Sequence, residues 1–503
     1  MDTRRLNIAQ ARKLAKDLLK SGDQSRFLTS HPEFAKGVQR PPKLSDAQWV
    51  VAREAGFESW ARLKHALERR DSDRARNAAA LIESALDGDL PRSVSLLESD
   101  GDLSAQDFAT ALVTGDVEVV EELLGEDRTL ARGTYSRRKL PPLFLCTRSA
   151  LAARGREGDF AGCARALCAA GCDVNQRIAF DPPWQGSNGS PLYYAAGFHG
   201  NRELAKALLD LGASPNDAET LYHSVEKNDP ELLRLLHPHN RDMGEWSYAF
   251  IHLMDFESPE TARTMLELGV DLSHRHPQSG ETALHWAVRN GRSPKILTML
   301  LQAGADPAAK DAGGMGAYAR AARSGDAAAA GAMERFGYRE ELDGMSRLML
   351  AAALLDSAGV AAVVAETPNI WERVGTCESS ALHRAAAGGR VGAVRGLIRL
   401  ARFDPAVRDE TGATALHHAC LNGEVEVVRE LVQAGAPLNI KDYTHESSPI
   451  GWTCWASENP PFADRQRELA DIAAMLLRAG SDRPVGLSGS KGIMEVLMRE
   501  GGG

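Results

Sequence analysis

Histidines and carboxylates recur at a spacing of three residues in the middle of this chain. His223 is followed by Glu226, and His252 is followed by Asp255. Residues three apart share a face of a helix, so each imidazole is expected beside a carboxylate. A histidine beside a carboxylate can act as a general base, and such a group can also bind a metal, a peptide or a small molecule.

An aromatic and a cationic side chain show the same spacing of three residues further along the chain. Trp286 is followed by Arg289, whose guanidinium can hold an anionic group. Half of the 14 histidines lie between His199 and His276. The region therefore combines imidazoles, carboxylates, an arginine and aromatic rings within a short length of chain.

Other patterns that could support chemistry are weak. His237 and His239, and likewise His274 and His276, are each one residue apart, which can suit zinc or copper. Both pairs fall in expected loops without a cysteine or a strong carboxylate cluster. The sequence has no phosphate-binding loop, no Gly-x-Ser-x-Gly and no His-Glu-x-x-His motif. We therefore predict no catalytic residue, no metal site and no cofactor.

The composition is that of a folded, mildly acidic protein. The 503 residues are 43% hydrophobic and carry a formal charge of −9, which argues against broad binding to nucleic acid. The sequence contains no run of about 18 apolar residues, so no membrane span is predicted. The chain opens Met-Asp-Thr-Arg-Arg, unlike a secretory signal, so a cytoplasmic location is expected.

A repeat of 34 residues supplies the elements that must position these side chains. In the clearest unit Thr414 can cap a helix, and His417 lies three residues later, where its side chain can form the reciprocal hydrogen bond of a capping box. Gly435 ends a second helix. A helix pair this small cannot bury its own apolar face, so neighbouring units must stack. Three stretches begin alike: Thr282-Ala-Leu-His285, Ser380-Ala-Leu-His383 and Thr414-Ala-Leu-His417.

These units resemble ankyrin repeats. Residues 45–64 and 448–455 also resemble a family of long bacterial ankyrin proteins, which implies an architecture and a bacterial, cytoplasmic setting but no activity. We predict an all-α ankyrin solenoid of about twelve units over residues 73–484. A helical domain over residues 1–72 precedes it, with helices expected over residues 6–19, 45–55 and 58–67. A linker with a capping helix over residues 485–503 follows it. Unit starts are expected near Ala78, Phe108, Leu140, Ser190, Glu219, Tyr248, Thr282, Gly316, Ser346, Ser380, Thr414 and Ser448.

When units four to seven are aligned, the spaced pairs occupy equivalent positions in successive units, and we call this row of side chains the ladder. The same position of the repeat holds Tyr194, His223, His252 and Trp286 in successive layers. Three residues further on lie Glu226, Asp255 and Arg289, whereas unit four breaks register through one extra residue at 197–199. The long loop at 176–189 contributes Trp184, and Phe198 adds another aromatic ring nearby.

Two interpretations of the ladder remain open. It can form a contact surface or pocket for a partner, or the position can be semi-buried in every unit and filled by bulky side chains, as at His418 and Trp452. We predict a non-enzymatic scaffold or adaptor that binds a protein partner on its concave surface. The alternative is a small-molecule-binding protein or enzyme with a pocket on the inner helices of units four to seven.

Overall fold

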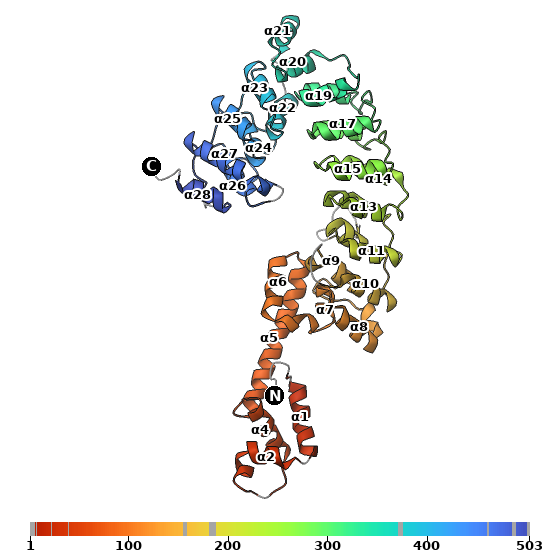
Figure 1. Cartoon of the computed structure of the whole chain (residues 1–503), viewed down its shortest axis with the longest axis vertical. Helices are drawn as coiled ribbons and strands as arrows, with labels where there is room; N and C mark the ends of the chain where they lie inside the picture. Colours follow the sequence, from red (N-terminus) through yellow and green to blue (C-terminus); the bar gives the residue numbers. More distant parts are fainter. Residues whose placement is uncertain are drawn as a thin grey trace. The chain divides into compact units, whose positions relative to one another are not determined.

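The polypeptide folds almost entirely into helices (Figure 1). Contacts divide the chain into an N-terminal unit, residues 1–220, and a C-terminal unit, residues 221–503. Among the described residues, the strands are the antiparallel pair β1 (Ile178–Ala179) and β2 (Asn188–Gly189). The computed structural model describes residues 6, 8–21, 23–38, 40–153, 158–180, 188–370, 376–459, 462–484 and 489–499.

The N-terminal unit opens with a small helical bundle. Apolar side chains form its core, among them Leu18, Phe27, Val50 and Leu63. The helices predicted over residues 6–19 and 45–55 are present, each displaced by one or two residues. The bundle consists of α1 (Ile8–Ser21), α2 (Gln24–Ser30), α3 (Pro32–Ala35), α4 (Leu44–Glu54) and the first turns of α5 (Trp60–Leu86).

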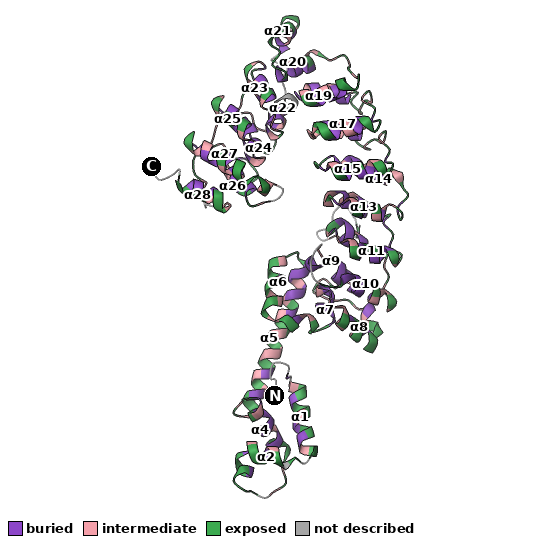
Figure 2. Ribbon diagram, viewed as in Figure 1, coloured by how far each residue is buried: buried purple, intermediate pink, exposed green. Residues whose placement is uncertain are grey.

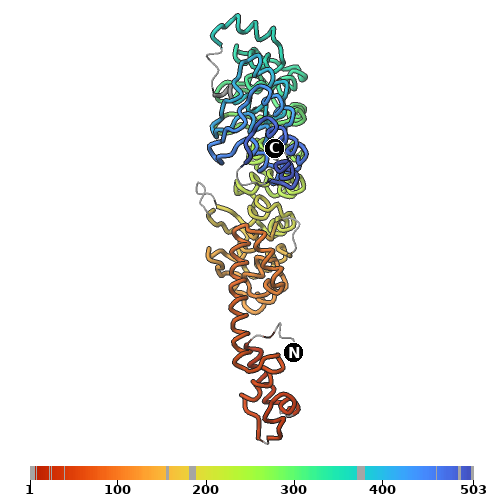
Figure 3. Tube along the Cα trace, turned by 90° about the vertical axis from the view of Figure 1, so that its left-hand side faces the viewer, coloured from red at the N-terminus to blue at the C-terminus, as the bar shows by residue number. Residues whose placement is uncertain are grey.

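The third helix is longer than the sequence predicted. We expected one helix over residues 58–67 and a new repeat helix near Ala78, but α5 runs unbroken from Trp60 to Leu86 (Figure 3). Residues 68–77 contain neither glycine nor proline, so nothing interrupts the backbone hydrogen bonds there. The boundary expected after residue 72 falls inside α5, which the bundle shares with the first repeat.

Twelve helix pairs follow one another along the described residues, which confirms the predicted all-α solenoid. Buried residues line the helix faces that meet neighbouring helices, and exposed residues line the outer edges (Figure 2). Short 3-10 helices lie at Gly101–Ala105, Arg128–Arg132 and Ala150–Ala152. The first four pairs are the end of α5 with α6 (Leu90–Ser99), α7 (Phe108–Thr114) with α8 (Val117–Glu126), α9 (Pro142–Arg148) with α10 (Phe160–Ala169), and the π-helix η4 (Tyr193–Phe198) with α11 (Arg202–Asp210).

The remaining eight pairs belong to the C-terminal unit, although the first helix among them starts at the end of the N-terminal unit. They are α12 (Glu219–Ser224) with α13 (Pro230–Leu236), α14 (Met243–Leu253) with α15 (Pro259–Glu267), α16 (Ala283–Arg289) with α17 (Pro294–Gln302), α18 (Ala317–Arg323) with α19 (Ala327–Arg335), α20 (Gly344–Ala353) with α21 (Ser357–Glu366), α22 (Thr376–Ala387) with α23 (Val391–Arg399), α24 (Ala415–Leu421) with α25 (Val425–Gln433), and α26 (Pro449–Ala456) with α27 (Gln466–Arg478). Helix α28 (Lys491–Arg499) then packs on α27 through Ile493 and Leu497.

The register break predicted in unit four takes the form of a π-helix. In η4 the backbone widens, and the amide of His199 donates to the carbonyl of Tyr194 across five residues. A π-turn accommodates one residue more than an α-turn, which is what the alignment of this unit required.

Histidine caps open two of the repeats as predicted. The Nδ1 atom of His285 accepts from the backbone amide of Thr282 at 3.3 Å, and His417 does the same for Thr414 at 3.0 Å. Because each Nε2 atom also meets a backbone carbonyl of the following hairpin, both rings are neutral with the proton on Nε2. These histidines therefore fasten a helix start to the next repeat.

Three predicted repeat starts were placed too late. Tyr248 and Ser346 lie inside α14 and α20, because Asp242 and Asp343 supply the N-caps earlier in the chain. Ser380 lies inside α22, which begins at Thr376, so it does not cap the helix as expected. His383 still bonds the carbonyl of Val407 through Nε2 at 3.1 Å, and the ring keeps its role as a link between repeats.

Candidate functional site

The predicted histidine and carboxylate pairs form a continuous chain of hydrogen bonds. His223 on α12 meets Glu226 in the 3-10 helix η5 (Val225–Lys227), with Nδ1 and Oε1 2.9 Å apart. The same Oε1 atom lies 3.0 Å from Nε2 of His252 on α14. Glu226 thus bridges two histidines from successive repeats, which the sequence alignment had placed in adjacent layers.

The chain of bonds continues into the next repeat through Asp255. Its Oδ2 atom lies 2.9 Å from Nδ1 of His252, and its Oδ1 atom accepts from the indole of Trp286 at 2.6 Å. Asn290 donates to the same Oδ1 at 2.7 Å. We call His223, Glu226, His252, Asp255, Trp286 and Asn290 the His–carboxylate network; it crosses α12, α14 and α16.

An aromatic stack runs beside the network. The ring of Tyr222 lies almost parallel to that of His252, with centroids 3.9 Å apart, and Tyr248 lies 5.8 Å from Tyr222. His276 stacks on Tyr248 at 5.8 Å and meets Trp286 at 4.8 Å. These rings pack against His252 and Trp286 and restrict the orientation of both side chains.

The charges of the network favour a protonated imidazole between carboxylates. Burial by itself lowers the pKa of His252, but hydrogen bonds with Asp255 and Glu226 outweigh it and the pKa is raised. Burial likewise raises the pKa of Asp255, yet hydrogen bonds from His252 and Trp286 leave that pKa lowered. Ionised carboxylates only accept hydrogen bonds, so His252 donates from both ring nitrogens.

Arg289 joins this surface in a different way from the one the alignment suggested. Its guanidinium lies over the ring of Trp286 at 4.7 Å, a cation–π arrangement. Its ion pair is with the buried carboxylate of Glu281, at 3.0 Å, rather than with Glu226 or Asp255. Half of the Arg289 side chain remains exposed.

Family models identify the repeats that carry this geometry. A model of ankyrin repeats in three copies matches residues 221–311 and 340–442, and a single-repeat model matches residues 188–220. The chain contains ankyrin repeats. No curated protein matches the chain in sequence. The crystal structure of the ankyrin repeat domain of Bcl-3, described as a unique member of the IkappaB protein family, is similar at 20% identity over 50% of this chain and 97% of that one, with a TM-score of 0.23.

The remaining predicted site residues lie in or before the ankyrin repeat at 188–220. Tyr194 is only 5% exposed and packs edge-on against Phe144 and Phe198, with centroids 6.0 Å away in each case. Burial raises the pKa of its hydroxyl. Phe198 is 52% exposed, and Trp184 lies outside the described residues.

In each of the two hairpins that carry paired histidines, one of the rings packs against an aromatic side chain. His237 packs edge-on against Trp246, with centroids 5.2 Å apart, whereas His276 is taken up by the aromatic stack. Within the described ranges, no group of three or more histidine, cysteine or carboxylate side chains is arranged to hold a metal. The same ranges contain no helix long and apolar enough to cross a membrane.

Sequence reasoning missed several partners of the network. Tyr222 and Tyr248 lie one and four residues before the ladder histidines, and Asn290 directly follows Arg289. The spacing of four between Tyr248 and His252 was a usable signal, because such residues share a helix face. The bridge from Asn290 to Asp255 depends on the stacking of α16 on α14, which a single sequence does not give.

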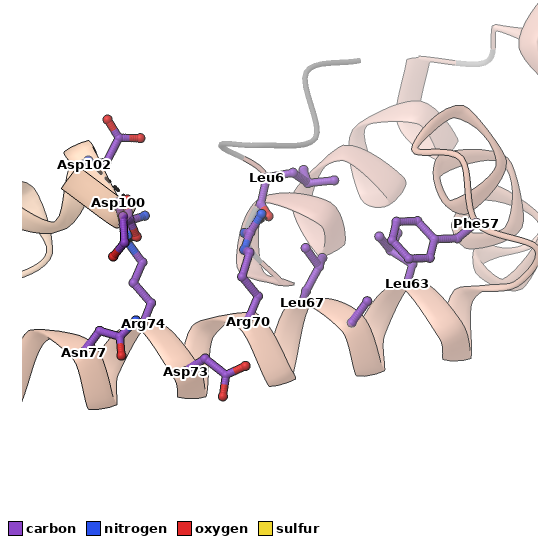
Figure 4. A pocket seen from close by; sticks show the side chains of 12 residues that line it. Leu6, Phe57, Leu63, Leu67, Arg70, Asp73, Arg74, Asn77, Asp100 and Asp102 are labelled. Atoms are coloured by element: carbon purple, nitrogen blue, oxygen red, sulfur yellow. Dashed lines mark hydrogen bonds and ion pairs between the residues drawn. The ribbon is translucent and has the colours of Figure 1, made fainter. Parts of the chain in front are cut away.

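A separate cavity of about 680 Å³ lies beside α5 in the N-terminal unit (Figure 4). Its apolar end includes Leu63 and Leu67. At its polar end Arg74 pairs with Asp100, Nε to Oδ2 3.1 Å, while Arg70 donates to the backbone carbonyl of Leu6. These bonds tie the helical bundle and the first repeat to the shared helix α5.

Replacing Asp255 by alanine is expected to lower the free energy of unfolding by about 1–2 kcal/mol. Trp286, Asn290 and His252 would each lose an acceptor, although exposure of the site softens the loss. The measurement is urea unfolding near neutral pH. Glu260→Ala is the matched control, since Glu260 pairs with Arg263 at the exposed surface of α15, and a change within about 0.5 kcal/mol is expected. Equal stability of both variants would contradict the network.

Proposed function

We propose that the protein is a non-enzymatic scaffold or adaptor, working in a bacterial cytoplasm, that binds a partner protein on the inner ankyrin helices. The observation that carries this is the surface formed by the network together with Arg289. Parts of it remain open to solvent: 31% of the His223 side chain, 37% of that of Asp255 and half of that of Arg289. Tryptophan and arginine are enriched among residues that dominate binding energy.

The network also supplies rigidity before a partner arrives. Trp286 is held by its bond to Asp255, and Arg289 is held between the Trp286 ring and Glu281. Side chains that are already fixed lose little entropy on binding, so more of each contact appears as affinity. Ankyrin repeats present such fixed rows of side chains over successive layers.

A general-base role for His252 receives little support from the geometry. Both of its ring nitrogens already bond carboxylates, and its raised pKa favours the protonated form. A base must accept a proton through a free nitrogen within reach of the substrate. The arrangement is better suited to holding three repeats in register and presenting charge at their surface.

Binding to the native partner is expected to weaken at least tenfold when Trp286 or Arg289 is replaced by alanine, because truncating such residues at an interface costs about 2 kcal/mol or more. The experiment captures proteins from the source organism with the full chain and then measures the affinity of the stoichiometric partner. Arg263→Ala is the control, since its ion pair with Glu260 lies on an outer helix.

Two outcomes would overturn the proposal. One is the absence of any stoichiometric protein partner, and the other is full retention of binding by both variants. A thermal shift with a metabolite that disappears in the His223→Ala, His252→Ala double variant would instead favour the small-molecule alternative.

A further inference from the structure

The last ankyrin repeat contains an apolar pocket that lies apart from the His–carboxylate network. Its volume is about 340 Å³. We call it the Trp455 pocket. It is lined by Leu421, His445, Ser447, Trp452, Trp455 and Phe462, from α24, the hairpin before α26, α26 itself and the 3-10 helix Phe462–Arg465.

Two indoles form the walls of the Trp455 pocket. The indole nitrogen of Trp452 donates a hydrogen bond to Oδ1 of Asp442 at 3.3 Å, so the ring offers its apolar faces to the pocket. His445 lies edge-on to Trp452 with centroids 6.4 Å apart. Trp455 meets Phe462 at 6.2 Å, yet its side chain is left largely in water, with 52% of the residue exposed.

The exposed ring of Trp455 adjoins an apolar pocket, which distinguishes it from a single exposed side chain on an open surface. Covering a large exposed ring favours binding by about 25 cal/mol for each Å² of apolar surface that the partner removes from water. The pocket volume is at the lower end of the range for ligand sites, which suits one or two side chains better than a cofactor. Tryptophans in partly desolvated hollows are typical anchors of protein interfaces.

The residues around the pocket indicate the charge of its occupant. Glu446 lies between the lining residues His445 and Ser447, Glu458 follows Trp455 by three positions, and Asp464 follows Phe462 by two. All three carboxylates are exposed, and none has an ion pair within the described part of the chain. The nearby cation Arg465 is already paired with Glu424 at 2.7 Å. Three exposed carboxylates thus lie within three residues of the lining in sequence, and we call them the acidic rim; their charge attracts basic groups.

We propose that the Trp455 pocket binds a peptide segment of a partner protein that inserts an aromatic or aliphatic side chain and places a lysine or arginine against the acidic rim. The apolar walls take the anchor, and the three rim carboxylates select the flanking cation. The site is independent of the His–carboxylate network, which lies in earlier repeats, so this inference stands even if the network has no partner.

The test selects binders from a displayed library of random dodecapeptides on the full chain. Enriched peptides are expected to pair an aromatic or aliphatic residue with a neighbouring lysine or arginine. Their affinity, measured by titration calorimetry, is expected to fall at least tenfold with Trp455→Ala. It should fall about threefold with Glu458→Gln and decrease as salt is added, since rim charges are screened.

Tyr443→Ala is the matched control for the loss of an exposed aromatic ring. Tyr443 is 66% exposed in the same repeat and lies outside the pocket lining, so its loss should leave peptide affinity unchanged. Trp286→Ala should also leave it unchanged, which separates this site from the proposed network surface. Thermal unfolding of each variant checks that it folds, and Phe462→Ala provides a second pocket variant.

Three results would overturn the inference. They are a selection that enriches no peptide, enriched peptides that are acidic or lack an apolar anchor, and peptides that bind the Trp455→Ala and Phe462→Ala variants as tightly as the parent.

Discussion

Replacing Gly396 by alanine is expected to destabilise the C-terminal unit by about 3 kcal/mol or more. A Cβ atom at this position would lie 1.7 Å from the backbone carbonyl oxygen of Ala352 and 2.6 Å from its carbon. Backbone atoms cannot step aside as a flexible side chain would, so α23 must separate from α20. Urea unfolding measures the loss, and hydrogen exchange of peptides from α20 and α23 should locate it.

Gly392→Ala is the control within the same helix. Gly392 is exposed, and a Cβ atom there would meet nothing within 4 Å. Alanine is the better helix former by about 1 kcal/mol, so this variant should be more stable than the parent. If Gly396→Ala unfolds at the parent's urea concentration, the close approach of α23 to α20 does not exist in solution.

This close approach marks an irregular step in the array. Helix α20 packs directly on α23, the second helix of the next pair. The 34-residue spacing from Ser346 to Ser380 predicted a regular step instead, with Ser380 at the start of a helix. Helix α22 begins at Thr376, so the first helix of this repeat is longer than the pattern suggested. The helix starts at Gly344 and Thr376 do not keep the expected spacing, and the packing at this step could not be predicted from it.

Local signals predicted the regular repeats well. Where a threonine is followed by histidine at the third position, as at Thr282 and Thr414, the start of the helix was placed correctly. The capping hydroxyl and its histidine partner then lie within the same four residues of the sequence. Tyr248 and Ser346 were misplaced because aspartates several residues upstream cap those helices equally well, and several possible caps leave the choice to tertiary packing.

The site could be predicted in part for the same reason. Pairs three residues apart, such as His223 with Glu226 and His252 with Asp255, follow from helical spacing, and both carboxylates lie just past the end of their α-helix. Bonds between repeats depend on the stacking of one layer on the next, so the bridge from Glu226 to His252 was expected only as proximity. Arg289 illustrates the limit, because its partner Glu281 comes from the hairpin before its own helix.

The two proposed surfaces of the C-terminal unit differ in the chemistry that each offers. The network presents fixed charges and a partly covered indole, which suits polar recognition. The Trp455 pocket presents an apolar hollow with an acidic rim. Separate sites on one repeat array allow one chain to hold two segments, of one partner or of two, and linked sites raise the overall affinity through effective concentration.

Replacing His417 by alanine is expected to lower the free energy of unfolding by about 2–4 kcal/mol at neutral pH. The ring is fully buried and joins the amide of Thr414 to the carbonyl of Ser447. Its loss leaves a buried donor and a buried acceptor without partners and removes a helix cap. His417→Gln should lose less, because a glutamine at this position can still accept from Thr414.

The pH dependence of that loss separates the cap histidine from the network histidine. Burial lowers the pKa of His417 to about 4. The unfolded imidazole titrates near pH 6.5, so the stabilising effect of neutral His417 is complete above about pH 6.5 and is lost as the pH falls towards 4. His252 has a raised pKa, so its contribution is complete below about pH 6.5 and is lost as the pH rises through its folded pKa.

The measurement that checks this is the stability gap between the parent and His417→Ala, followed by urea unfolding from about pH 7.5 to pH 4. The gap should shrink by roughly 3 kcal/mol towards the acid end, because the parent must then bury a ring whose unfolded form is protonated. His65→Ala, at an exposed position of α5, is the matched control for removing a histidine outside the caps. A gap that stays constant over the whole range would mean that His417 is not held in the neutral form, and the cap would then need a different hydrogen-bonding partner.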